Sequence, residues 1–300
     1  MKKLILLLLT IIMIFLTACQ SITEPPEPTS QLIEYGIVTD NAYNNCFCGI
    51  TTNLPWRLYD DGTLVLEEGS ICWKYVASMM GAHEESWSYT RQIGISPWYD
   101  MYFEDNRNIK TIIFTGSVTG GRNLVGLFGL LSELQHIENI HYLDTSRATN
   151  ISFMFQDTFN LKDLDLSSWD VRLVEDTISM FERSGITNPN TSNWALNNLT
   201  NTWDMFRNTE NLTHLDLSGW DVRNMYKAQF WFSGATSLQE ITLGENFVFE
   251  SIIGDKDFQL PPIQPTETYT DYWQNVDNGT TDNPQGEYIF INLRTTNDKS

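Results

Sequence analysis

Apolar side chains recur at a fixed interval through the second half of the chain. Trp169, Trp194 and Trp220 each stand twelve residues before a phenylalanine, so one pattern of about 25 residues repeats in register. An earlier copy runs from Leu143 to Phe155, with the leucine in the tryptophan place. A unit this short cannot bury its own apolar face, so the copies are expected to stack side by side into a solenoid.

The first half of each copy alternates apolar and polar residues. Leucines alternate with polar residues in 161–167, and 212–218 repeats this pattern almost residue for residue. A period of two predicts half-buried strands, which stack in parallel from copy to copy.

A Met-Phe pair, or Trp-Phe in the last copy, closes the second half. Ile151 and its equivalents stand near one helical turn before it, which predicts a short helix or helical turns. We expect the Met and aromatic ladders to form the core, with a sugar-stacking surface as the alternative for the tryptophans. Together the two halves predict an α/β solenoid of leucine-rich-repeat type, with short parallel strands plus short helices or turns.

The copies are numbered from the one that contains Leu143, so Trp169, Trp194 and Trp220 belong to the second, third and fourth copies. The third copy departs from this pattern. Thr187, Pro189 and Thr191 stand where other copies carry leucines or similar apolar residues. Because proline cannot donate to a strand ladder, we expect an irregular strand around Pro189, either a bend or a docking site.

The repeats, assigned to residues 123–250, lie between two other folded segments. Residues 36–122 are predicted to form a β-rich N-terminal cap, and residues 251–300 a linker and a short C-terminal β segment.

Three motifs belong to the cap. Residues 57–66 are predicted to form a hairpin that turns at Asp60-Asp61-Gly62, and 109–114 a buried strand. The glycine-rich stretch 116–122 lacks the Lys-Ser or Lys-Thr ending of a phosphate loop and is expected to be a turn.

The first residues predict export. Lys2 and Lys3 precede an uncharged run from Leu4 to Leu16, which makes residues 1–18 a signal peptide too short to span a membrane. The tetrapeptide ending in Cys19 resembles the bacterial lipoprotein box, which implies a lipid on that thiol and a cell-membrane anchor facing outward. An ordinary secreted protein is the alternative. Residues 19–35, proline-rich and polar at their start, are expected to be a flexible tether.

Charge excludes one class of partner. The 300 residues include 38 acidic and 18 basic side chains, for a net charge of −20. Nucleic-acid binding needs clustered Lys and Arg, so we expect none.

Cysteines allow a disulfide outside the membrane. A bond from Cys48 to Cys72 would close a short loop within the cap, and Cys46 to Cys72 is the alternative. A zinc site is a weaker alternative because no fourth ligand is evident, so no metal and no cofactor are expected.

Aspartates recur at two places in the repeats. Asp165 and Asp216 align on the strands, and Asp144, Asp170 and Asp221 in the turn that follows. We expect the turn aspartates to cap backbone amides, with calcium binding as the alternative.

The motif Leu-Asp-Leu-Ser-x-Trp-Asp, followed by a polar stretch and Met-Phe, resembles the repeat of BspA-like leucine-rich-repeat surface lipoproteins of mycoplasmas and low-GC Gram-positive bacteria. Residues 143–155 and the segments before and after the repeats carry the same resemblance. It implies a cell-surface protein that binds partners through its repeats.

No arrangement of catalytic residues is evident, so the chain is expected to be a non-catalytic adhesion module that binds a protein or glycan outside the cell. The alternative is a carbohydrate-binding or hydrolytic lipoprotein with a cleft near the cap, suggested by Trp87, Trp98, Tyr99 and Tyr102. The expected binding face comprises outward strand residues: Asp163, Asp165, Ser167, His214, Asp216, Ser218, Glu240 and Thr242.

Overall fold

The computed structural model describes residues 30–39, 50–74, 76–80, 90–94, 97–98, 109–191, 193–226, 228–244, 273–274 and 288–289. The expected signal peptide and Cys19 lie outside these ranges. The elements are β1 (Leu32–Thr39), β2 (Asn53–Tyr59), β3 (Thr63–Leu66), β4 (Gly69–Lys74), β5 (Val76–Met80), β6 (Thr90–Gly94), β7 (Thr111–Phe114), β8 (Val118–Val125), β9 (His136–Glu138), the 3-10 helix η2 (Ile140–Tyr142), β10 (Leu143–Asp144), β11 (His214–Leu217), β12 (Glu240–Leu243), β13 (Trp273–Gln274) and β14 (Tyr288–Ile289).

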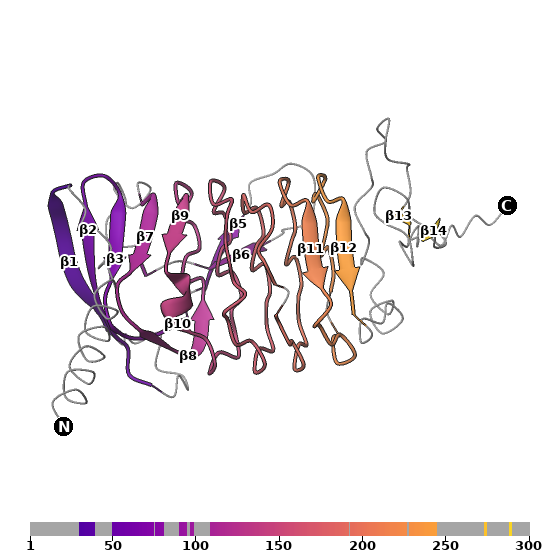
Figure 1. The fold of residues 1–300 in the computed structure, drawn as a ribbon, viewed down its shortest axis with the longest axis horizontal. Coiled ribbons are helices and arrows are strands. Elements are labelled where there is room, and N and C mark those ends of the chain that lie inside the picture. Colours follow the sequence, from indigo (N-terminus) through magenta and orange to yellow (C-terminus); the bar gives the residue numbers. More distant parts are fainter. Residues whose placement is uncertain are drawn as a thin grey trace, which may run out of the picture.

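Eight strands form one mixed sheet that curls around the N-terminal end of the core (Figure 1). β3, β7 and β9 are parallel and build one wall, and β4, β8 and β10 are parallel and build another. Antiparallel β2 pairs with β3 and β4 and so joins the two walls, while β1 pairs with β2. The sheet therefore closes the first end of a row of parallel rungs that continues to β12.

The cap contains the predicted hairpin. β2 and β3 are antiparallel, with Trp56 opposite Leu66, and the Asp61 carboxylate accepts a hydrogen bond from the Thr63 amide at 2.9 Å. The expected buried strand at 109–114 is also present as β7, in which Ile112 and Phe114 are buried. β1 begins at Leu32, earlier than the expected start of the cap at residue 36.

The glycine-rich stretch is a strand and not the expected turn. Gly120 and Gly121 lie within β8, between β4 and β10. A Cβ atom on Gly120 would lie 2.5 Å from the Asp144 carbonyl oxygen, and one on Gly121 would lie 2.7 Å from the Cys72 Cβ. These glycines therefore allow β4 and β10 to approach β8 closely.

The predicted α/β solenoid of leucine-rich-repeat type is wrong. Within the described ranges there is no α-helix, and η2 is a single short turn of 3-10 helix. The molecule is instead built from strands, a curled half-barrel sheet and tight turns.

The segments expected to be helical form a parallel backbone ladder. The amides of Phe153, Phe155 and Asp157 donate hydrogen bonds to carbonyls of the next copy, each one residue before the equivalent position, at 2.8 to 3.0 Å. In an α-helix these amides would bond to carbonyls of the preceding turn in the same segment. Because every second amide is directed to the next copy, the segment cannot coil into a helix.

Left-handed residues produce this ladder. Phe153 and Asp157 have φ values of 61° and 60°, and equivalent pairs recur in the following copies: Ser179 and Arg183, Asp204 and Asn208, Phe230 and Gly234. A left-handed residue reverses the local turn of the chain and costs roughly 1–2 kcal/mol when it carries a side chain. The inter-copy hydrogen bonds and the buried Met-Phe pair between the two left-handed sites offset that cost.

Aromatic rings form two continuous columns in the interior, as predicted. Phe155, Phe181, Phe206 and Phe232 stack at centroid distances of 5.4 to 5.7 Å. Trp169, Trp194 and Trp220 stack at 6.3 and 6.1 Å. All seven rings are at most 3% exposed, so the tryptophans form core and not a sugar-binding surface.

The third copy is irregular where predicted, since Asn190 beside Pro189 is left-handed with φ of 44°. The strand expected in the second copy at 161–167 is also reduced to an isolated bridge, from Asp163 to Asn188 of the third copy. The Trp194 indole N–H donates a buried hydrogen bond of 2.9 Å to the Leu166 carbonyl. This bond joins the third copy to the second through a side chain.

We predict that Trp194→Phe lowers the free energy of unfolding by about 1 kcal/mol more than Trp220→Phe. Both changes remove a similar apolar volume, but only the first leaves the buried Leu166 carbonyl without its indole donor. Urea unfolding of the two variants measures the difference. Equal destabilisation would show that the hydrogen bond contributes nothing.

Asn208 tests the left-handed positions because it is exposed and has φ of 55°. Asn208→Val is expected to destabilise the chain by about 1–2 kcal/mol, since a β-branched residue is strained there, while Asn208→Gly stays within about 0.5 kcal/mol. Thermal unfolding gives both values. A valine variant as stable as the glycine variant would contradict the assigned backbone conformation.

Candidate functional site

The outward side of the strand wall carries all eight residues of the predicted binding face. We call this surface the strand face and define it by ten side chains: Asp163, Asp165, Ser167, Asn188, Asn190, His214, Asp216, Ser218, Glu240 and Thr242. They are exposed or half-buried, whereas the leucines between them point into the core. The surface therefore arises from alternation along β11, β12 and the bridged segments of the second and third copies, repeated from copy to copy.

The regular end of the strand face is the parallel pair β11–β12. Its register places His214 beside Glu240 and Asp216 beside Thr242. The His214 Nε2 atom lies 3.9 Å from a Glu240 carboxylate oxygen, and both side chains are partly exposed. Such an exposed pair contributes little to stability and leaves these groups accessible to a partner.

Asparagines of the third copy complete the strand face. Asn188 bridges to Asp163, and the Asn190 amide group donates a 2.8 Å hydrogen bond to the Asp165 carboxylate. Both were missed from the sequence because the leucine pattern fails around Pro189. They stand one repeat length after Asp163 and Asp165, and this spacing was the signal that could have found them.

The turn aspartates cap backbone amides, as predicted. The carboxylates of Asp144, Asp170 and Asp221 accept hydrogen bonds from amides two residues further on, at 3.0, 3.2 and 3.1 Å. Asp165 and Asp216 on the strand segments also cap amides two residues further on, at 3.1 and 2.9 Å. For the calcium alternative, no group of three or more His, Cys, Asp or Glu side chains within the described ranges could hold a metal ion.

Two turn aspartates also bind arginines. The Arg172 guanidinium donates to both Asp170 carboxylate oxygens, at 2.9 and 2.6 Å, and Arg223 does the same to Asp221. These hydrogen bonds from the arginine side chains lower the pKa of Asp170 and of Asp221. The two aspartate–arginine pairs lie two copies apart because the copy between them has Ala195 at the aspartate position.

Of the aromatic residues that suggested a carbohydrate-binding cleft near the cap, the structure describes only Trp98. Trp98 is 1% exposed and packs edge to face against Trp56 at 6.5 Å. It is therefore a core residue with no surface for a sugar. Trp87, Tyr99 and Tyr102 lie outside the described residues.

Cys72 is fully buried and forms a disulfide bond. Cys46 and Cys48, the two partners considered from the sequence, lie outside the described residues. The Cys72 amide also donates to the Thr52 hydroxyl at 3.1 Å, which holds β4 against the segment before β2.

Residues 122–244 match a family model described as Mycoplasma protein of unknown function, DUF285. This range coincides with the repeats and supports the mycoplasma side of the resemblance, while the description names no repeat type, location or ligand. No curated protein and no solved structure matches the chain. Within the described ranges, no helix has both the length and the hydropathy needed to cross a membrane.

The pKa of Asp165 lies below its ordinary value of 3.8 because the Ser167 hydroxyl, the Ser167 amide and Asn190 donate hydrogen bonds to the carboxylate. A lowered folded pKa stabilises the fold above the unfolded pKa, and this stabilisation is lost as the pH falls through the folded pKa.

We therefore expect the melting temperature of Asp165→Asn to fall less than that of the native chain when the pH drops below about 4. Ser167→Ala removes the largest of these donors and should raise the pKa of Asp165 in an NMR titration. Identical melting profiles for native chain and Asp165→Asn would refute the role of this carboxylate.

Proposed function

We propose that the chain is a bacterial surface lipoprotein of the BspA-like kind, anchored through Cys19, that binds partners without catalysis. The supporting observation is the strand face, in which polar side chains at equivalent positions of successive copies lie side by side. One row contains Asp163, Asn188, His214 and Glu240.

A row of this kind suits a macromolecular partner. Neighbouring strands are separated by about 4.8 Å, so four rungs offer groups along roughly 15 Å of surface. The side chains are held by a rigid ladder and by capped turns, which limits the entropy lost on binding. Short polar groups on a preformed surface favour recognition of an extended protein or glycan.

The charge of the strand face determines which partners it attracts. Asp163, Asp165, Asp216 and Glu240 are acidic, and His214 is the one residue among its ten members that can become positive. Such a surface repels nucleic acid and acidic polymers, attracts positively charged partners and admits neutral ones.

Exposure on the cell is the remaining part of the proposal. The basic start, the apolar run and the Leu-Thr-Ala-Cys ending of residues 16–19 support lipid attachment. Mass spectrometry of the mature protein from its native membrane should find a diacylglyceryl group on Cys19.

The triple variant Asp163→Ser, His214→Ser, Glu240→Ser is expected to reduce binding of cells displaying the full chain to host cells or matrix by about tenfold, because contact residues on one face act together. The matched control is Glu175→Ser, Thr200→Ser, Tyr226→Ser. These three residues lie in successive copies and are joined by backbone hydrogen bonds from Thr200 to Glu175 and from Tyr226 to Thr200. Equal binding by both variants would refute the placement on the strand face, provided that both are displayed and folded.

A further inference from the structure

Strand β1 exposes a run of large apolar side chains. Ile33, Tyr35 and Ile37 are 57%, 76% and 55% exposed, and Leu32 beside them is 43% exposed. The other exposed large apolar residues of the described chain, among them Phe159, Leu173 and Tyr226, are dispersed among the repeats. We call Ile33, Tyr35 and Ile37 the β1 stripe.

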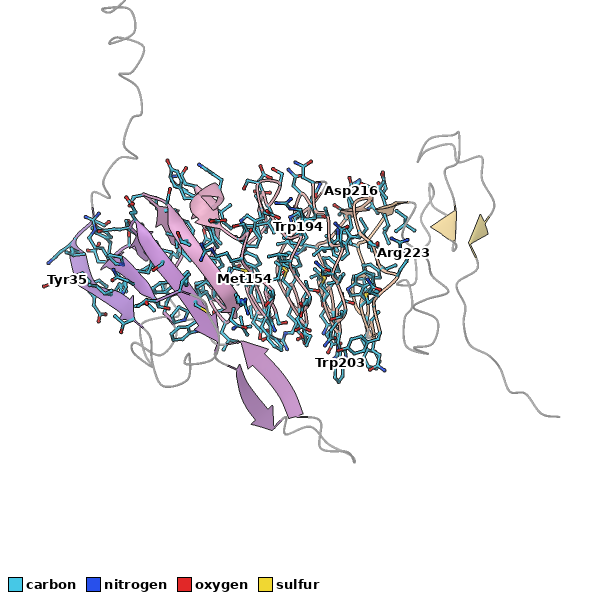
Figure 2. The ribbon with its side chains drawn as sticks, turned by 90° about the horizontal axis from the view of Figure 1, so that it is seen from below. Tyr35, Met154, Trp194, Trp203, Asp216 and Arg223 are labelled. Atoms are coloured by element: carbon cyan, nitrogen blue, oxygen red, sulfur yellow. The ribbon has the colours of Figure 1, made fainter. Side chains whose placement is uncertain are left out.

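The stripe is the unused side of a strand whose other side is packed. Val38 is 6% exposed, and Gly36 lies so close to Trp56 that a Cβ atom would come within 2.8 Å of the indole. Among the described strands, β1 pairs only with β2, with Tyr35 opposite Arg57 and Ile37 opposite Pro55. Figure 2 places Tyr35 at one end of the elongated body.

We propose that the β1 stripe rests in the interface of a lipid bilayer and orients the repeats away from the membrane. This inference relies on the lipid anchor of the proposed function. The chain enters the fold at Gln31, whose amide donates to the Asp60 carboxylate at 3.0 Å and whose carbonyl accepts from the Asp60 amide at 3.0 Å. Residues 20–29 separate Cys19 from the described chain, and this segment can span at most about 35 Å.

Composition favours lipid over a second copy of the chain. Tyrosine and branched aliphatic side chains suit the boundary between headgroups and acyl chains. Glu34 is the one charged residue of β1, and Arg57 opposite Tyr35 is paired with Glu67 at 2.8 Å, so this side of the sheet carries little net charge into that boundary. Two copies meeting at β1 would instead bring together two chains of net charge −20, which repel each other.

Hydroxyl-radical footprinting of the full lipidated chain on phosphatidylcholine vesicles tests the proposal. Tyr226, at 65% exposure, is the matched control for Tyr35 at 76%. In a chain that begins at Gln20 and keeps every described residue, the two tyrosines should be oxidised about equally in water. On vesicles the ratio of Tyr35 to Tyr226 oxidation should fall by about fivefold or more, because interfacial burial removes Tyr35 from the solvent.

Co-flotation of the chain from Gln20 with the same vesicles tests the stripe without the anchor. The variant Ile33→Ser, Tyr35→Ser, Ile37→Ser should float about tenfold less than the native sequence, and Tyr226→Ser should not change flotation. Near-ultraviolet circular dichroism identifies any variant that fails to fold, and footprinting of the unaltered chain then decides.

The outcomes separate the stripe from the anchor. An unchanged tyrosine ratio on a chain that floats overturns the stripe and leaves the anchor standing. A full chain that does not float refutes the anchor, and co-flotation of the chain from Gln20 then decides the stripe alone. Protection of Tyr35 that appears without lipid and rises with dimer in sedimentation overturns the proposal in favour of a second copy.

Discussion

The parallel stacking of one rung on the next is the interaction on which the structure depends. A single copy has an apolar side that it cannot cover, and it directs every second amide of its turn segment outward. The next copy supplies both the rings that cover the apolar side and the carbonyls that accept those amides. Neither half of this exchange is available to an isolated copy.

This exchange also explains the unusual backbone. Ten residues other than glycine have positive φ in the described chain, most of them at equivalent positions of successive copies. Each is locally unfavourable, yet the conformation recurs because it aims an amide at the neighbouring rung and keeps the Met-Phe pair inside. The cost is local, whereas the compensating contacts come from the next copy.

The surface follows from the same repetition. Because equivalent side chains are brought into rows, single polar residues from four copies together form one extended surface. Capping by Asp165 and Asp216 serves the turns, and the same carboxylates contribute charge to the strand face. Stability and the proposed binding therefore share residues on this wall of the molecule.

The sequence alone determined the register of the copies, the two aromatic columns, the capping aspartates, the irregular third copy and the alternation that exposes the strand face. Each of these depends on residue type and spacing, which are visible along the chain. Only the tertiary structure decided that the second half of each copy is a ladder of left-handed turns, that 116–122 is a strand, and that Asn188 and Asn190 complete the strand face. Those features arise from backbone contacts between copies, and a hydrogen bond to a residue of the next copy leaves no local pattern of apolar residues.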